Sequence, residues 1–502
     1  MSGLTIEGEA AHSGTLTGVL SEDVAQMRRR LYGDINADAH FRSFRIGATQ
    51  LCICYMEGMA DDNKIGAFIL HACGMEEDRG ASPRRWTSGE LMERVLEIAQ
   101  CEAEARPESL VRSVVSGMSA VLVDGSREAL VVETRGYPAR QVNRTTNESV
   151  VIGSQEGFVE SLRTNVTLIR RYLPSSRLIS EPMSAGSEFP CSLCLMYLEG
   201  TTDPGIVAAL RDRIRRIDAP SVDGIGELQQ YIEDRPFAIL PQMLQTERPD
   251  RAASCLREGQ AIVLAENSPY ALVAPATVFH QLHASDDSFA RWQYGTFLRV
   301  IRLCGVLLSV FLPGLYIALT SHHMHLIPMS LLTSIAEARA NVPFPILVEI
   351  LIMEFSFSLI NEAGTRIPQQ IGSALGIVGA LILGQAAVAA SIISPILIII
   401  VALTGLGNYA VPDYGFSVGL ILYRLFVILC GALLGLFGIC IAGYCILLSV
   451  CGERSLGFPY ALPLAPSRPH NPDILLRLPV WTQVHRALYG RRGASGEGGE
   501  NP

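Results

Sequence analysis

Two acidic residues lie within a largely apolar stretch of the chain, and their position calls for a chemical explanation. Glu349 and Glu354 belong to residues 346–364, which read ILVEILIMEFSFSLINEAG. In a membrane, a carboxylate at such depth is destabilising by several kcal/mol unless it is paired, protonated or in contact with water. Two placements follow: the carboxylates line a water-filled path, or they pack inside a helical bundle with Arg424 or with backbone groups. The first placement would favour cations, as acidic rings do in channels.

A second set of residues could bring helices close together or meet an ion. In residues 371–407 small side chains recur at every fourth position, namely at Gly372, Gly376, Ala380 and Gly384. Such a stripe lets helix backbones approach closely, and one interpretation is tight packing within one subunit. The alternative is a thin helix that packs against copies of itself around a pore axis, with Gln385 among the few polar groups available to an ion.

No sequence pattern typical of enzymes carries a catalytic function in this chain. The Walker loop, GxGxxG and HExxH are absent from the sequence. Cys191 and Cys194 have the spacing of a redox or zinc pair, but no second pair and no nearby histidines complete a site. We interpret them as packed structural thiols. We therefore predict no enzyme, no metal site and no cofactor.

Four apolar blocks in the second half of the chain must carry the membrane residues. They span residues 297–321, 346–364, 371–407 and 416–450. A single helical crossing needs about 20 residues, so each of the last two blocks is either one long broken helix or two short ones. Residues 322–345 are expected to lie along the membrane surface. Basic residues after the second and last blocks indicate four crossings, or six, with both ends of the chain in the cytosol.

Composition and charge exclude one class of partner and place the first half of the chain. The net charge of -9 and the pI near 5.7 argue against nucleic-acid binding, for which a basic face is expected. The N-terminal sequence has no basic segment followed by an apolar core, so we expect no signal peptide and a cytosolic first half.

The first half contains an internal repeat with a constant offset of 142 residues, from 51 to 193. LCICYMEGMADD at 51–62 matches LCLMYLEGTTDP at 193–204, and AVLVDGSREALV at 120–131 matches IVLAENSPYALV at 262–273. Each copy reads as an apolar strand, an acidic turn able to cap a helix, that helix, and later a hairpin around DGS or ENS. The expected fold is therefore two tandem duplicated α/β units in the cytosol, followed by an all-α transmembrane domain of four to six helical segments.

These patterns divide the chain into six parts. They are an N-terminal tail (1–40), a first α/β unit (41–145), a connecting helix (146–184), a second α/β unit (185–290), a helical transmembrane domain (291–452) and a partly disordered cytosolic tail (453–502). In the connecting helix, apolar residues recur at helical spacing while Arg163, Arg170 and Arg171 stay polar. We expect a solvated basic face there; the alternative is a docking helix for a neighbouring subunit.

Several longer phrases carry a resemblance to a known family. They are IGSQEGFVESLRTNVTLIRR at 152–171, TERPDRAASCLREGQAIVL at 246–264, NVPFPILVEILIMEFSFSLINEAGTRIPQQIGSALGIVGALILGQAAV at 341–388 and FPYALPLAP at 458–466. From about residue 40 to Pro466 the chain resembles the A subunit of GerA-type spore germinant receptors. The related sporulation protein SpoVAF shares the architecture but usually diverges where this chain has VPFPILVE and EAGTRIP.

The resemblance implies an integral protein of the spore inner membrane, with both termini on the spore core side, that takes part in nutrient-triggered germination. It implies a homo-oligomer, a pentamer, that acts as a ligand-gated channel for monovalent cations in membrane lipid. The implied partners are a permease-like B subunit and a lipoprotein C subunit. The alternatives are a secondary transporter of a small solute, suggested by helix breaks at Pro313 and Pro395, and a non-conducting scaffold of a receptor complex.

Overall fold

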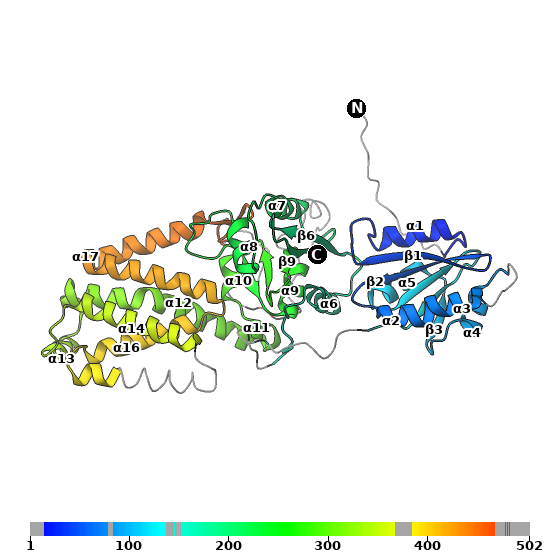
Figure 1. The fold of residues 1–502 in the computed structure, drawn as a ribbon. Coiled ribbons are helices and arrows are strands. Elements are labelled where there is room, and N and C mark those ends of the chain that lie inside the picture. The colour runs from blue at the N-terminus through cyan, green and yellow to red at the C-terminus, as the bar shows by residue number, and fades with distance from the viewer. Residues whose placement is uncertain are drawn as a thin grey trace, which may run out of the picture.

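The protein consists of two α/β units and a helical bundle arranged in a row. The structure, a computed structural model, describes residues 15–78, 84–136, 152–366 and 384–466, together with residues 145, 148, 150, 477, 479 and 481. Figure 1 shows the second α/β unit between the first unit and the bundle. An α/β first half and an apolar helical second half are therefore confirmed.

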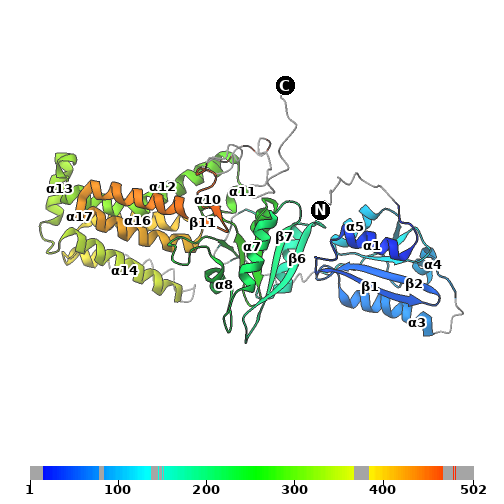
Figure 2. The same cartoon turned by 90° about the horizontal axis from the view of Figure 1, so that it is seen from above.

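The first unit is an antiparallel sheet with helices on both faces. Its strands are β1 (Ala39–Ile46), β2 (Thr49–Met56), β3 (Cys101–Glu104), β4 (Ser119–Val123) and β5 (Ala129–Val132), in the order β1-β2-β4-β5-β3. One face packs on α1 (Leu20–Arg30) and α5 (Pro107–Val115). The other packs on the π-helical turn η1 (Ile65–His71), which follows the short α2 (Asp62–Lys64), and on α3 (Ala72–Asp78) and α4 (Ser88–Arg94). Figure 2 shows α1 and α5 on one side of the sheet and α3 on the other.

The second unit repeats this arrangement. Its strands are β6 (Leu178–Ala185), β7 (Cys191–Leu198), β8 (Leu244–Thr246), β9 (Ala261–Ala265) and β10 (Ala271–Ala274), in the order β6-β7-β9-β10-β8. Helices α6 (Leu162–Tyr172) and α9 (Pro249–Arg257) cover one face, and α7 (Pro204–Arg215) and α8 (Ile225–Ile232) cover the other. The predicted hairpins are present: Gly125 and Asn267 turn the chain with φ of 82° and 60°. The predicted duplication is thus confirmed in the fold.

The repeat extends further toward the N-terminus than the predicted boundaries. Helix α1 starts at residue 20 and α6 at residue 162, again an offset of 142 residues. The chain before each helix is fixed in the same way: Asp23 Oδ1 accepts the N–H of Thr17 at 2.8 Å, and Asn165 Oδ1 accepts the N–H of Val159 at 2.8 Å. The first helix therefore belongs to the first unit rather than to a tail. Equally, α6 belongs to the second unit rather than to a separate connection.

A buried arginine of α6 joins the two units. The Arg170 side chain is 3% exposed, and it donates from Nε to Asp38 at 2.7 Å and from Nη2 to Asn36 Oδ1 at 3.1 Å. Both acceptors belong to the first unit. The predicted solvated basic face is therefore wrong for Arg170, because the first unit covers this side of α6. Arg171, the next residue, does lie at the surface.

The bundle begins with two short helices, continues with a long one and ends with a helical hairpin. Its elements are α10 (Val278–Leu282), α11 (Asp286–Phe289), α12 (Trp292–Ser321), η2 (Met324–Leu326), α13 (Met329–Arg339), α14 (Ile346–Arg366), α16 (Pro395–Tyr409) and α17 (Tyr414–Gly452). Helix α17 turns back at Gly435, whose φ is 64°, and the hydroxyls of Tyr423 and Ser449 from its two halves meet at 2.9 Å. The last apolar block therefore forms two helices rather than one long broken helix, which is one of the two predicted arrangements (Figure 1).

Within the described part of the chain, two helices are long and apolar enough to cross a membrane. They are α12 and α17, whereas α16 is apolar but shorter. The number of crossings stays a prediction. Residues 453–466, which we expected in the C-terminal tail, return to the second unit and include the short strands β11 (Arg454–Ser455) and β12 (Phe458–Pro459). There Ser455 Oγ accepts the N–H of Ala276 at 3.0 Å.

Candidate functional site

A buried ion pair links three helices of the bundle. Arg424 of α17 contacts Glu354 of α14, with 3.1 Å between Nη2 and Oε2, and its Nη1 donates to Ser309 Oγ of α12 at 3.3 Å. The two charged side chains are 7% and 13% exposed. Charges removed from water to this extent need a partner of opposite sign, and each supplies it to the other. Arg424 is thus the partner of Glu354, which is one of the two placements that the sequence predicted.

Glu349 has a different partner from the one expected. Its side chain is 1% exposed, Oε1 accepts from Nη2 of Arg339 at 2.9 Å, and Oε2 accepts the N–H of Ser394 at 3.1 Å. Ser394 is the N-cap of α16, so the carboxylate also binds an N–H that has no partner within that helix. Arg339 belongs to α13, in the segment that we expected along the membrane surface, and no sequence pattern pairs it with Glu349.

A small polar cavity adjoins the Glu354–Arg424 pair. Ser358 and Asn361 follow Glu354 along α14, and Thr404 and Asn408 line the same cavity from α16. About 20 Å³ of it is open to the centres of water molecules, which is room for one or two waters. Among the described residues, Oε1 of Glu354 has no hydrogen-bond partner. None of these polar neighbours was predicted from the sequence, although Ser358 and Asn361 follow Glu354 at helical spacing, which was a readable signal.

Two other predicted residues that the structure describes, Gln385 and Gly384, do not line this cavity. Gln385 is exposed. A Cβ on Gly384 would meet its nearest neighbour, Ile398, at 3.8 Å, which is an ordinary contact rather than a close helix approach. The remaining stripe residues, Gly372, Gly376 and Ala380, lie outside the described residues.

Close helix approach occurs instead where α12 meets α16 and α17. A Cβ on Gly431 of α17 would lie 2.8 Å from the carbonyl oxygen of Gly314 in α12. A Cβ on Gly407 of α16 would lie 2.5 Å from the carbonyl oxygen of Gly305, also in α12. Small residues at such crossings let helix backbones touch in membrane proteins. These contacts hold α16 and α17 against α12 and so fix the helices that carry Asn408, Ser309 and Arg424.

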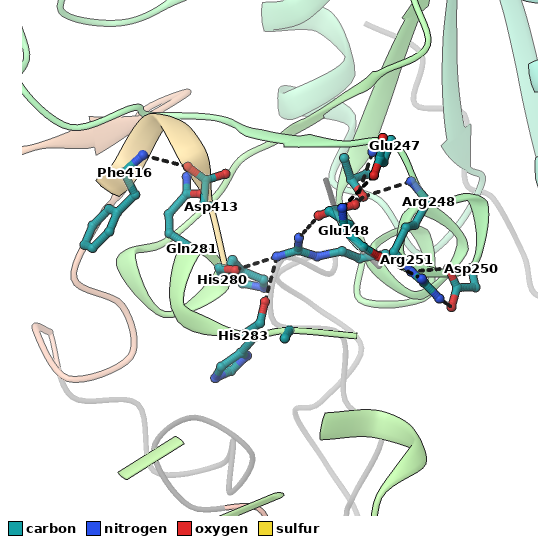
Figure 3. A network of polar contacts seen from close by, with 12 residues as sticks. Glu148, Glu247, Arg248, Asp250, Arg251, His280, Gln281, His283, Asp413 and Phe416 are labelled. Carbon is teal, nitrogen blue, oxygen red and sulfur yellow. Dashed lines mark hydrogen bonds and ion pairs between the residues drawn. The ribbon is translucent and has the colours of Figure 1, made fainter. Parts of the chain in front are cut away.

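A second polar cluster lies where the second α/β unit meets α17 (Figure 3). Arg251 of α9 pairs with Glu148 and donates from Nη2 to the carbonyl of His280 in α10 at 2.8 Å. Asp413, the N-cap of α17, accepts the N–H of Phe416 at 2.7 Å. Burial raises the pKa of the Asp413 carboxyl, while the Phe416 N–H and the charge of Arg251 act in the opposite direction. The buried guanidinium of Arg251 in the α/β unit therefore acts electrostatically on Asp413, the residue that caps the hairpin.

Among the described residues there is no arrangement typical of metal binding, and two motifs that some enzymes use are in other structural settings here. No group of three or more His, Cys, Asp and Glu side chains among them is placed to hold a metal ion. Cys191 and Cys194 pack on opposite faces of the second sheet, and burial raises the pKa of Cys194 to about 12, so its thiol stays protonated. A GxSxG sequence is present at 415–419, but it lies in the first turns of α17 rather than on the strand-to-helix turn of hydrolases.

Known proteins are similar to this chain along most of its length. The chain matches the family described as Bacillus/Clostridium GerA spore germination protein over residues 26–489. It is 33% identical to spore germination protein KA of Bacillus subtilis (strain 168) over 471 residues, which cover 93% of this chain and 86% of the relative. It is 31% identical to the uncharacterized membrane protein YfkQ of the same strain over 476 residues, covering 93% of this chain and 91% of the relative.

A solved structure is also similar to part of the chain. It is the N-terminal domain of the A subunit of the Bacillus megaterium spore germinant receptor GerK3, with 26% identity and a TM-score of 0.42. The match covers 53% of this chain and 98% of that domain. The family match, over residues 26–489, extends from the first α/β unit through the bundle. The chain therefore belongs to the GerA family of spore germination proteins.

Proposed function

We propose that this chain is the A subunit of a nutrient germinant receptor in the spore inner membrane, where it forms an oligomeric ligand-gated channel for monovalent cations. Membership of the GerA family supports the role in germination. The observation that carries the channel proposal is Glu354, a buried carboxylate beside a polar cavity between apolar helices of the bundle. Intramembrane carboxylates are rare and mark ion pathways.

The contacts around this carboxylate fit a closed state. Its partner Arg424 neutralises it, and the cavity has room for only one or two waters. Opening would require the ion pair to separate or the helices around it to move apart. Arg424 lies on α17, so a force applied to α17 would act directly on the pair.

The junction between the α/β unit and the hairpin offers a route for such a force. Arg251 links Glu148 and the end of α10, and its charge acts on Asp413 at the start of α17. A shift of the second unit would therefore alter the environment of the N-cap of α17. Binding of germinant to a partner subunit would then change the balance between closed and open states.

Both ends of the chain are proposed to lie on the cytosolic, spore core side. The second unit precedes the bundle and residues 453–466 return to the same unit, as the bond between Ser455 and Ala276 records. An even number of membrane crossings would place the second unit and residues 453–466 on the same side of the membrane. Assembly with a permease-like B subunit and a lipoprotein C subunit, and a pentamer whose axis forms the path, complete the proposal.

The test is germinant-triggered potassium release. Receptor containing the A, B and C subunits would be reconstituted in potassium-loaded vesicles, and potassium outside them recorded after addition of nutrients that germinate the intact spores. We expect release with the full receptor and none from vesicles that contain B and C alone. Absence of release from a complete receptor that still binds its nutrient would contradict the proposal.

A non-conducting scaffold is the second candidate. The observation that favours it is that the two buried carboxylates of α14, Glu349 and Glu354, already have arginine partners within one chain. A scaffold would retain B and C during purification but pass no potassium. For the transporter alternative the two predicted helix breaks differ: α12 continues through Pro313, whereas the chain does break before Pro395, which starts α16 after the helical residues 384–389.

A further inference from the structure

A loop of the second α/β unit lies against the first turns of α17. It connects α8 to β8, and both views place α8 on the side of the unit that faces the bundle (Figures 1 and 2). Leu240 of the loop is 3% exposed and packs with Phe416 and Leu420 of α17. A Cβ on Gly419 would lie 2.8 Å from the carbonyl oxygen of Ile239. The loop backbone therefore runs directly along the helix, about one turn beyond its first residue.

A buried glutamine fixes the base of this loop. Gln242 is 1% exposed, and its Oε1 accepts the N–H groups of Asp234 and Arg235 at 2.8 and 3.2 Å. Its Nε2 donates to the carbonyl of Arg235 at 2.9 Å. These bonds close residues 235–242 into a defined tip whose two ends are held together. The tip is thus a built feature of the fold rather than an unconstrained connection.

The tip presents apolar side chains outward. Phe237 is 99% exposed and Ile239 is 41% exposed. On the adjacent turns of α17, Val418 and Leu422 are 43% and 53% exposed, and their surface continues into the rest of the apolar helix. Tyr414, at the first position of α17, is 73% exposed. Exposed tyrosines at helix ends are typical of the membrane–water interface, and a contiguous exposed apolar surface marks an interaction site.

We propose that the 235–242 tip is a membrane anchor, in which Phe237 and Ile239 enter the interfacial region of the bilayer beside α17. Lipid is the occupant because the tip is continuous with the helix surface that faces lipid in the proposed membrane placement. An apolar side chain that reaches a few ångströms below the headgroups is removed from water without crossing the bilayer. This inference rests on the membrane placement of α17 and adds that the second α/β unit itself touches the lipid.

Photocrosslinking in lipid vesicles tests the proposal. The full chain would carry p-benzoylphenylalanine in place of Phe237, and its adducts would be identified by mass spectrometry after illumination in phosphatidylglycerol-containing vesicles. Because Phe237 is fully exposed, its replacement disturbs no packing. The same substitution at Leu422 is the positive control, and at Phe68, 40% exposed in the first unit, it is the negative control.

We expect phospholipid adducts at positions 237 and 422 and none above background at position 68. Lipid adducts at 422 without any at 237 would overturn the anchor while leaving the membrane placement intact. No lipid adduct at either position would overturn the membrane placement on which the anchor rests. Adducts from position 237 to another protein chain, instead of lipid, would overturn the anchor and identify the tip as a protein-docking surface.

Discussion

Substitution of Arg170 should weaken the connection between the two α/β units. Arg170→Met removes a guanidinium that is 3% exposed and leaves the Asp38 carboxylate without its partner, while Asn36 Oδ1 keeps the N–H of Ser180 at 3.4 Å. Loss of one member of a buried ion pair is destabilising by about 3–5 kcal/mol. The Asp38 side chain is 17% exposed and can regain some water, so we expect the lower end of this range. In a folded unit of about 150–250 residues, a loss of about 3 kcal/mol in the free energy of unfolding lowers the Tm by roughly 6–12 °C.

Calorimetry of the full chain in detergent would measure this change, with Arg171→Met as the matched control. Arg171 pairs with Glu156 at 3.4 Å on the surface, and such pairs contribute at most about 1 kcal/mol. Adding Asp38→Asn to Arg170→Met should restore part of the Tm, because no unpaired buried charge then remains. Equal effects of Arg170→Met and Arg171→Met would refute the assignment of the junction to Arg170.

Two further substitutions probe the bundle and its junction. Gly431→Ala places a Cβ 2.8 Å from the carbonyl oxygen of Gly314 and should destabilise the bundle by about 1–3 kcal/mol, whereas Gly443→Ala, whose nearest neighbour would be at 3.4 Å, should be tolerated. Heating in detergent followed by size exclusion would compare them, and equal losses would argue against the α12–α17 contact. The pKa of Asp413 is raised above its ordinary value of 3.8, so its contribution to stability is present below pH 3.8 and is lost as the pH rises through the folded value. Asp413→Asn, which keeps an acceptor for the Phe416 N–H, should flatten that part of the Tm profile; an unchanged profile would contradict the assignment.

The repeat could be predicted because its strands and hairpins keep both their residue types and a constant offset. The same offset places Leu20 and Arg28 of α1 opposite Leu162 and Arg170 of α6. These identities were available in the sequence and would have assigned both helices to the repeat. They were missed because a short polar helix before the first strand reads equally well as a tail.

The burial of Arg170 could not be predicted from the same pattern. Arg28 and Arg170 occupy equivalent positions, yet their side chains are 45% and 3% exposed. Only α6 has another unit beside it, and the acceptor Asp38 lies 132 residues away in the chain. Burial of a helix face depends on the surface that covers it, which helical periodicity does not report.

The residues of the candidate site could be predicted only in part. The apolar context identified Glu349 and Glu354 as buried, because an isolated carboxylate among apolar residues needs compensation. Arg424 stood out as the complementary charge within another apolar block. Arg339 did not, because its helix is amphiphilic in sequence and its contact with Glu349 depends on how α13 and α14 pack.

Ion selectivity of the assembled receptor tests the central claim most directly. Reversal potentials would be measured in planar bilayers under a potassium chloride gradient, for the unmodified chain, for Glu354→Gln, and for Glu362→Gln, which removes an exposed carboxylate from the same helix. The channel account predicts a potassium-selective current after nutrient addition, with selectivity reduced by Glu354→Gln and retained by Glu362→Gln. No current from a nutrient-binding receptor, or identical selectivity in all three, would contradict it.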